Sequence, residues 1–393
     1  MKEKALYIAS NLFPVNSGAT IYTYGNILRF TDYFDVDLLS FVQCEHPDQD
    51  PYYNELISKV NSYEYLIFKE NYFFQLREGL KHRVFFQKYS KEFKKRVISA
   101  LEKEDYKYVF IEHILIYYLI QEIRLKSPLS KIITIEQNIE FQNLEEDLHF
   151  SRGYKDKLCK YLIKTGIKGF ELNSVENSDY SLFISTKDMD VMNHLRPNKN
   201  PKKYQLLKPF FPFKQIVFSK DLENKKYNLL ILGSMWWYPN IEGVKWFIKT
   251  VFPLLIEKDN RYKVYIVGNG PSKGIQELGN EKIIFTGKVA SVDEYIKDSD
   301  FLIVPTFTGG GVKIKIMEGI LKGIPVISRT ENIVGYEDIF TESFHAVNPQ
   351  DFVNLIISGN NNPKVKTEFV EAAKKKLNEY SDISDLIRNL ESD

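Results

Sequence analysis

One short stretch of the chain gathers residue types that bind anions. Residues 309–311 are three glycines, and they precede a predicted helix at 312–321 that carries Lys313, Lys315 and Glu318. Glycine lets backbone N–H groups approach a ligand closely, because no Cβ stands in the way. The start of a helix adds free N–H donors and the positive end of the helix dipole. The stretch therefore predicts a site for a phosphate or a similar anion.

The two lysines strengthen this prediction, because cations are unfavourable in the first turn of a helix. Each cation there opposes the dipole at a cost of roughly 0.3–1 kcal/mol. A bound diphosphate would explain why Lys313 and Lys315 occupy this turn. The alternative is a glycine turn into a solvated helix, in which Lys315 and Glu318 share a face and form an ion pair.

The elements around this stretch predict where the site lies. An apolar run at 301–305 precedes the glycines, and a second run at 326–328 follows the helix. This order of strand, glycine loop, helix and strand places the loop at the carboxyl end of a parallel sheet, where doubly wound folds bind ligands.

Strand and helix patterns alternate along most of the chain, which predicts α/β architecture with two Rossmann-like domains. Two prolines and a polar stretch predict a hinge near 205–225. We expect an acceptor-binding domain at 1–210, a nucleotide-sugar-binding domain at 211–363, and a helical segment at 364–393 that packs back on the first domain. A cleft between the two facing parallel sheets is the expected ligand site. The predicted strands are 5–10, 36–42, 108–111, 132–135, 181–184, 229–232, 263–267, 283–285 and 301–305.

Bulk composition excludes several classes of protein. The 393 residues carry 53 basic and 52 acidic side chains, so no global positive field points to nucleic acid. The two cysteines, Cys44 and Cys159, form no motif and indicate a reducing compartment. The apolar patch before Asn11 is too short for a signal peptide, and the run at 109–120 is too short for a membrane span. We expect a cytoplasmic protein.

The second half resembles the donor-binding domain of GT-B fold glycosyltransferases of family 4, also called glycosyl transferases group 1. The matching segments keep the family's order and spacing. They are LGSMWWYPNIEGVKWFIKTVFPLL (232–255), VYIVGNGP (264–271), IIFTGKV (283–289), YIKDSDFLIVP (295–305), GGGVKIKIMEG (309–319) and GIPVIS (323–328). The first half is similar to the family's acceptor domain at 11–28, 134–143 and 179–188.

This resemblance implies a nucleotide-sugar donor held mainly by the second domain, with no cofactor and no metal. Lys315 would occupy the family's basic position, with Lys313 beside it, and would stabilise the diphosphate leaving group. Glu318 would accept hydrogen bonds from the ribose hydroxyls. Domain closure would bring the first glycine loop to Lys315. The other implied donor contacts are Gly309, Gly310, Gly311, Gly233, Ser234, Val289, Ser17 and Gly18.

Two positions depart from the family pattern. Many members carry a second glutamate where this chain has Gly310, although a subgroup with three glycines shares that feature. Gln137 stands where the family has a histidine that contacts the donor sugar, and it is grouped here with the catalytic residues. A glutamine can hydrogen-bond but cannot carry a proton. His113 could contribute instead, or could be a hydrogen-bonded histidine at a strand end.

These features predict a metal-independent retaining glycosyltransferase. It would move a sugar from a nucleotide donor, expected to be UDP-linked, to a saccharide or lipid-linked acceptor in bacterial surface polysaccharide or glycoconjugate synthesis. The alternative is a catalytically weak GT-B subunit that binds glycan or a partner protein without turnover, as Gln137 and Gly310 suggest. Intact Lys315 and Glu318 count against that alternative.

Several other features of the sequence allow two interpretations. The basic and aromatic stretches at 81–96 and 154–170 could rest on an anionic membrane surface, or could be solvated helices with apolar sides in the core. Trp236 and Trp237 could stack on a sugar or belong to the core. Three Asp-x-Asp pairs are interpreted as strand-edge charges rather than metal motifs, and they begin at Asp35, Asp188 and Asp298.

Overall fold

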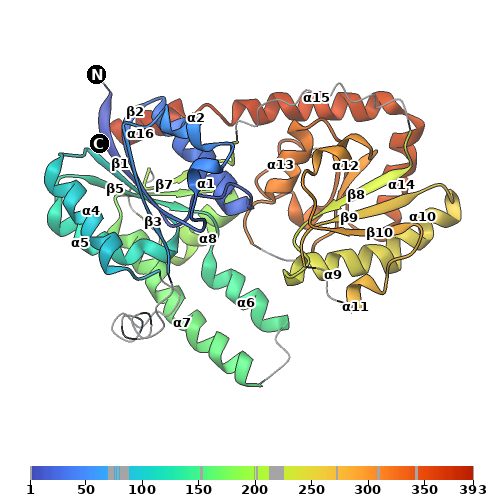
Figure 1. The fold of residues 1–393 in the computed structure, drawn as a ribbon, viewed down its shortest axis with the longest axis horizontal. Helices are drawn as coiled ribbons and strands as arrows, with labels where there is room; N and C mark the ends of the chain where they lie inside the picture. Colours follow the sequence, from blue (N-terminus) through green and yellow to red (C-terminus); the bar gives the residue numbers. More distant parts are fainter. Residues whose placement is uncertain are drawn as a thin grey trace. The chain divides into compact units, whose positions relative to one another are not determined.

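The computed structural model divides the chain into two compact units (Figure 1). The first unit is Met1–Phe211 with Ser381–Asp393, and the second is Pro212–Tyr380. The structure describes residues 2–69, 75, 77, 79, 88–150, 154–198, 200, 202–211, 225–270, 273–307, 310–340 and 344–392. Most of the predicted hinge at 205–225 lies outside these residues.

The first unit is built on a seven-stranded parallel sheet of order β3-β2-β1-β4-β5-β6-β7. Its central strands are almost uninterrupted apolar runs, as expected when helices cover both faces of a parallel sheet. The strands are β1 Glu3–Ala9, β2 Phe34–Val42, β3 Ser62–Ile67, β4 Tyr108–Glu112, β5 Lys131–Glu136, β6 Tyr180–Phe183 and β7 Tyr204–Leu206.

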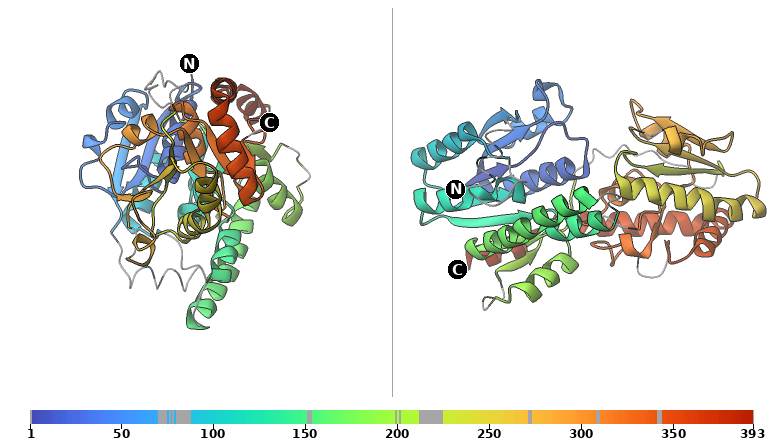
Figure 2. Two further views of the ribbon diagram at one scale, coloured as in Figure 1. Left: turned by 90° about the vertical axis from the view of Figure 1, so that its right-hand side faces the viewer. Right: turned by 90° about the horizontal axis from the view of Figure 1, so that it is seen from below.

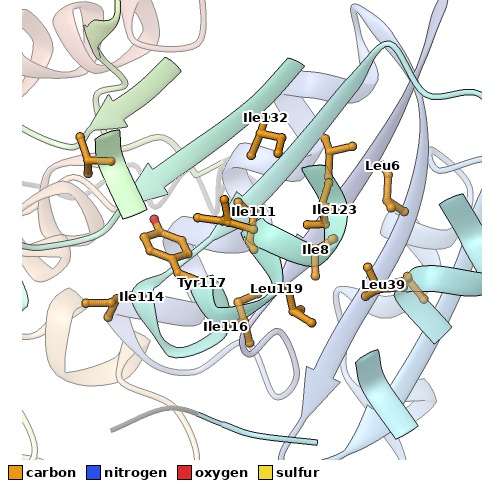
Figure 3. Close-up of a cluster of buried hydrophobic side chains, with 14 of the residues drawn as sticks. Leu6, Ile8, Leu39, Ile111, Ile114, Ile116, Tyr117, Leu119, Ile123 and Ile132 are labelled. Carbon is orange, nitrogen blue, oxygen red and sulfur yellow. The ribbon is translucent and has the colours of Figure 1, made fainter. Parts of the chain in front are cut away.

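One face of this sheet packs into a large apolar cluster (Figure 3). Leu6 and Ile8 of β1 lie there with Ile111 of β4, and Tyr117 and Leu119 cover them from the segment after β4. The helices of the unit are α1 Gly18–Thr31, η1 Pro47–Gln49, α2 Tyr53–Ile57, α4 Lys91–Lys103, η2 Ile114–Leu119, α5 Ile120–Lys126, α6 Glu140–Phe150, α7 Tyr154–Asn177, α8 Thr186–Leu195 and α16 Ser384–Glu391. Figure 2 shows α6 and α7 reaching together beyond the sheet.

The second unit has a six-stranded parallel sheet of order β10-β9-β8-β11-β12-β13. The chain leaves β8 toward one side of the sheet and returns at β11 to build the other side, so the switch point lies between these two strands. The strands are β8 Asn228–Leu232, β9 Lys263–Val267, β10 Ile283–Gly287, β11 Phe301–Val304, β12 Val326–Arg329 and β13 His345–Ala346.

The helices of the second unit begin with α9, which follows β8 directly. They are α9 Tyr238–Trp246, η3 Phe247–Val251, α10 Phe252–Lys258, α11 Lys273–Gln276, α12 Asp293–Lys297, α13 Ile314–Leu321, η4 Thr330–Asn332, α14 Pro349–Asn361 and α15 Pro363–Glu379. The predicted α/β class with two parallel sheets is confirmed. Within the described residues, no helix is both long and apolar enough to cross a membrane.

The C-terminal segment is shared between the two units. Helix α15 belongs to the second unit, where Lys366 is fully buried and donates to Asn360 Oδ1 at 3.0 Å. Helix α16 belongs to the first unit, where Lys131 Nζ donates to the Leu390 carbonyl at 2.9 Å. Of the segment predicted at 364–393, the residues after Tyr380 therefore lie with the first unit.

Candidate functional site

Two loops meet at the switch point of the second unit. The first loop joins β8 to α9 at residues 233–237, and the second joins β11 to α13 at residues 305–313. Because β8 and β11 are hydrogen-bonded parallel neighbours, both loops leave the same edge of the sheet. This edge is where doubly wound folds bind their ligands.

Glycines allow close packing at the ends of β8 and β9. The backbone of Gly233 packs against the Asn240 side chain, and the backbone of Gly268 packs against that of Gly233. A Cβ on Gly233 would lie 2.5 Å from Asn240 Nδ2, and a Cβ on Gly268 would lie 1.9 Å from the Gly233 carbonyl oxygen. The Gly268 N–H donates to the Gly287 carbonyl at 3.1 Å, which ties in the end of β10. The ends of β8, β9 and β10 thus form one continuous rim.

Lys315 reaches from the first turn of α13 to the end of β8. Its ammonium donates to the Leu232 carbonyl at 2.7 Å and to Asn240 Oδ1 at 3.0 Å. Both acceptors are neutral. Desolvation and the positive charge of Lys313 together lower the pKa of Lys315 from 10.5 to about 7, although Glu318 opposes the shift.

Lys313 supports the glycine loop. It is the N-cap residue of α13, which begins at Ile314, and its side chain is buried. Its ammonium lies 3.2 Å from the Gly310 carbonyl and 5.6 Å from the Trp237 ring centroid. The helix thus starts two residues later than the predicted 312, and only Lys315 of the two lysines lies within its first turn.

The glycines before α13 have distinct settings. Gly310 is exposed, and Gly311 has a φ of +67°, which favours glycine. Gly309 lies outside the described residues. Helix α13 has neither a side-chain N-cap bond nor an acidic residue in its first turn, so its start keeps the N–H donors and dipole charge that attract anions.

Glu318 pairs with a partner that the sequence analysis did not consider. Lys322, the C-cap residue of α13, donates to Glu318 Oε1 at 2.7 Å and also contacts Asp293 Oδ1 at 2.8 Å. The alternative ion pair between Lys315 and Glu318 is therefore not the arrangement found. The Glu318 carboxylate is paired with Lys322. Among the described residues, the hydrogen-bond acceptors of Lys315 are therefore the neutral Leu232 carbonyl and Asn240 amide.

The remaining predicted donor contacts of the second unit lie just after the ends of β8 and β10, on the rim formed by β8, β9 and β10. The Ser234 carbonyl accepts from Asn240 Nδ2 at 3.0 Å. Val289 follows the end of β10 and is partly buried. Trp236 is 70% exposed and so is not a core residue, whereas Trp237 is partly buried beside Lys313.

The predicted contacts of the first unit lie at the strand ends of its own sheet. Ser17 caps α1, because its hydroxyl accepts from the Thr20 N–H at 3.3 Å. Gly18 is the first residue of α1 and is exposed. Gln137 directly follows β5 and is buried.

Gln137 is held by a buried carboxyl group that the sequence analysis missed. Its Nε2 donates to Glu112 Oε1 and to Thr23 Oγ1, both at 3.0 Å. Tyr7 donates to the other Glu112 oxygen at 2.5 Å. Burial raises the pKa of Glu112 from 4.5 to about 7, although these hydrogen bonds oppose the shift. The only sequence signal was a lone glutamate at the end of an apolar strand.

His113 matches its structural interpretation. Its Nδ1 accepts from the Leu115 N–H at 3.2 Å, and its Nε2 lies 3.6 Å from Glu140 Oε1. Burial, aided by the charge of Lys88, lowers the pKa of His113 to about 3, so the ring is neutral. Its φ of +79° is uncommon for a residue other than glycine.

In each of the three Asp-x-Asp pairs, one carboxylate is hydrogen-bonded to a neighbouring residue of its own unit. Asp37 accepts from Asn61 and Tyr106, each at 2.8 Å, and Asp300 accepts from the Tyr227 N–H at 2.6 Å. Asp188 lies in the first turn of α8 and not at a strand edge, so the strand-edge interpretation is wrong for this pair, and its carboxylate accepts from Ser185 Oγ at 2.8 Å. Across the described part of the chain, no group of three or more His, Cys, Asp or Glu residues is arranged to hold a metal ion.

The basic stretch at 81–96 is described only from residue 88. There α4 buries Phe93, Val97 and Leu101 in the core, which fits the second interpretation for this part. Lys94 of the polar face pairs with Glu122 at 2.5 Å. Residues 81–87 and the side chains of 154–165 lie outside the described residues.

Comparison with known proteins finds similarity to one family within the second unit. Residues 226–358 match the family model "Glycosyl transferases group 1". An uncharacterized 44.6 kDa protein in the cps region of Klebsiella pneumoniae is 28% identical over 126 residues. That match covers 30% of this chain and 31% of the relative, so the alignment spans about a third of its length.

Solved structures show the same fold over nearly the whole chain. TarM superposes with a TM-score of 0.63 at 11% identity, covering 98% of both chains. Anabaena HepE in complex with UDP and glucose gives a TM-score of 0.64 at 12% identity, covering 99% of this chain and 98% of that one. The α,α-trehalose 6-phosphate synthase of Burkholderia multivorans gives 0.61 at 8% identity, covering 99% and 98%. The chain has the GT-B fold, and its residues 226–358 are similar to the glycosyl transferases group 1.

Proposed function

We propose that this chain transfers a sugar from a nucleotide-sugar donor to an acceptor, and that the switch-point rim of the second unit binds the donor diphosphate. The observation that carries the proposal is the environment of Lys315. Lys315 lies in the first turn of α13, whose start has no side-chain cap, and the two acceptors of its ammonium are neutral. Such a site is electropositive, and among the described residues no carboxylate is hydrogen-bonded to the ammonium, so an anion would complete it.

The same groups can promote the reaction. When the bond between the sugar and the distal phosphate breaks, negative charge develops on the departing diphosphate. A fixed ammonium and helix-terminal N–H groups stabilise this charge in the transition state more than in the ground state. Lys315 is positioned for this role, while Lys313 holds the loop and adds positive charge nearby. Two lysines can supply the charge that a metal supplies elsewhere, and we expect transfer without one.

The finer features of the proposal rest on the comparisons. HepE was solved with UDP, with UDP-glucose, and with UDP and glucose, which supports a UDP-linked donor. The Klebsiella relative lies in a cps region, which supports a saccharide or lipid-linked acceptor in surface polysaccharide synthesis. Retention of anomeric configuration is part of the proposal and is based on the family resemblance.

A donor-panel assay tests the proposed reaction. The purified full chain is incubated with UDP-, GDP- and ADP-linked sugars in EDTA, with candidate saccharide acceptors, and nucleotide release is followed. We expect release from one donor, at least a hundredfold slower in Lys315→Ala, in line with the loss of one transition-state donor of about 2.7–4 kcal/mol. Lys297→Ala, which removes an exposed lysine of α12, is the control and should match the wild type.

The outcomes separate the two candidate functions. Donor binding without release across the panel supports a subunit that binds without turnover, which the amide Gln137 favours because it cannot carry a proton. Equal rates of nucleotide release in Lys315→Ala and the wild type would contradict a role of the proposed diphosphate site in the reaction.

The proposal extends to location, because a lipid-linked acceptor would bring the chain to the inner face of a membrane. Contact would be electrostatic through the polar face of α4, since Phe93, Val97 and Leu101 are buried. Flotation with anionic vesicles at low salt tests this, and absence of association there would end it.

A further inference from the structure

We propose that Asn240 is a positioning residue for Lys315, because its side-chain amide fixes the ammonium at the end of β8 and ties it to the loop at 233–237. Nothing in the sequence pattern singled out Asn240. The inference rests on the proposed diphosphate site, since it concerns how that site is held ready for its ligand.

The contacts of Asn240 fix the orientation of its amide. Oδ1 accepts from Lys315 Nζ at 3.0 Å, and Nδ2 donates to the Ser234 carbonyl at 3.0 Å. An ammonium can only donate and a carbonyl can only accept, so the reverse orientation would lose both hydrogen bonds. The residue is 6% exposed, which leaves little room for another rotamer.

The surrounding backbone is shaped to admit this amide. Asn240 lies in the first turn of α9, directly after Pro239, whose fixed φ suits a helix start. Gly233 faces the amide, and a Cβ there would lie only 2.5 Å from Nδ2. Asn240 thereby joins two separate segments, the β8–α9 loop and helix α13.

The geometry leaves Lys315 with bonding capacity toward a ligand. An ammonium has three N–H donors. Two of them are used, by the Leu232 carbonyl and Asn240 Oδ1, and these two bonds fix the direction of the third. A diphosphate oxygen could accept that third hydrogen bond.

The neutrality of Asn240 matters as much as its geometry. The charged groups that act on Lys315 are Lys313 at the helix start and Glu318 one turn further on. Glu318 is paired with Lys322, which also contacts Asp293 of α12. On the β8–α9 side the partners are an amide and a carbonyl, so no carboxylate competes with the ligand for the ammonium. An aspartate at position 240 would be such a competitor and would hold the proton on Lys315.

Binding of UDP-glucose to the full chain, followed by titration calorimetry between about pH 6 and pH 9, tests the inference. UDP-glucose is chosen because its phosphates do not titrate near neutrality. Two buffers of different ionisation enthalpy report the number of protons taken up on binding. The variants are Asn240→Asp, Asn240→Ala and, as a matched control, Asn354→Asp on the exposed face of α14.

For the wild type we expect affinity to fall above about pH 7, by up to about tenfold per pH unit, with proton uptake, because only charged Lys315 binds the diphosphate. In Asn240→Asp this decline should move to higher pH and proton uptake near pH 8 should disappear, while affinity near pH 6 drops through competition. Asn240→Ala should weaken binding about tenfold or more at every pH. Asn354→Asp should match the wild type.

The outcomes distinguish this inference from the proposed function. If the wild type binds UDP-glucose and Asn240→Asp keeps the wild-type pH profile and proton uptake, Asn240 does not position Lys315. If Asn240→Asp and Asn240→Ala lose thermal stability equally but keep the wild-type affinity for UDP-glucose, the role of Asn240 is only structural. If the wild type and a panel of nucleoside diphosphates show no binding at all, the donor site itself is refuted.

Discussion

At the scale of single residues, the surroundings of Lys315 in the second unit and of Glu112 in the first unit share one physical feature. Each places an ionisable group where burial works against its charge, and each surrounds that group with polar partners. Burial lowers the pKa of Lys315 to about 7 and raises that of Glu112 to about 7. Perturbed groups of this kind gather at functional sites, because their charge can respond to a ligand or to pH.

Glu112 makes a prediction about stability. Its pKa is higher in the folded chain than the unfolded value of 4.5, so the folded state binds this proton more tightly. Its contribution to stability is therefore complete below about pH 4.5 and is lost as the pH rises through about 7. Glu112→Gln cannot ionise, and it should reduce the fall in unfolding free energy between these pH values by about 1–3 kcal/mol.

Urea denaturation at both ends of this window measures the difference. Glu45→Gln, which changes an exposed glutamate of the same unit, is the matched control and should follow the wild type. An identical pH dependence in Glu112→Gln and the wild type would contradict a pKa of Glu112 that is raised by folding.

At the scale of elements, the helices are fixed by caps and by a few buried polar contacts. Ser17 shows how such a contact bears on function. The resemblance implied that it contacts the donor, while the structure uses its hydroxyl to cap α1. Both roles are compatible with its exposed position.

Substitutions at Ser17 separate the two roles. Ser17→Ala should lower the unfolding free energy by about 1 kcal/mol through loss of the cap. Ser17→Asp should restore it, because aspartate caps helices equally well. If the residue approaches the donor diphosphate, Ser17→Asp should bind UDP-glucose more weakly than the wild type despite its restored stability. Equal affinities would leave Ser17 with capping alone.

Helix α15 provides a second prediction at this scale. Lys366 is fully buried between Asn360 and Asp300, whose carboxylate is 4.0 Å away. Lys366→Met should lower the unfolding free energy by about 3 kcal/mol, because it leaves a buried carboxylate without its cation. Lys364→Met, on the same helix and 81% exposed at the side chain, should change it by less than about 0.5 kcal/mol. Similar effects of the two substitutions would contradict the buried pair.

At the scale of the whole molecule, the proposed donor should act on the second unit. A ligand present at about 100 times its Kd stabilises the state that binds it by about 2.7 kcal/mol. Hydrogen exchange with UDP-glucose should therefore show protection in residues 233–240 and 310–322. Lys315→Ala should lose this protection, and protection confined to other segments would contradict the site.

The sequence predicted much of this architecture because strands and glycine turns are locally encoded. It missed β3, β7 and β13, since β3 mixes tyrosines with polar residues at an edge and the other two have three and two residues. It placed the start of α13 two residues early, because Val312 and Lys313 continue the helical pattern although Lys313 is only the N-cap.

What the sequence determined by itself was the α/β alternation and a glycine loop leading into a helix with Lys315 and Glu318. These are patterns within a few residues, and backbone chemistry dictates them. Only the tertiary structure decided the partners. Lys315 meets Asn240 across 75 residues, and Gln137 meets Glu112 across 25. Those pairs exist because parallel strands bring distant segments to one edge, and no local pattern records which side chains then face each other.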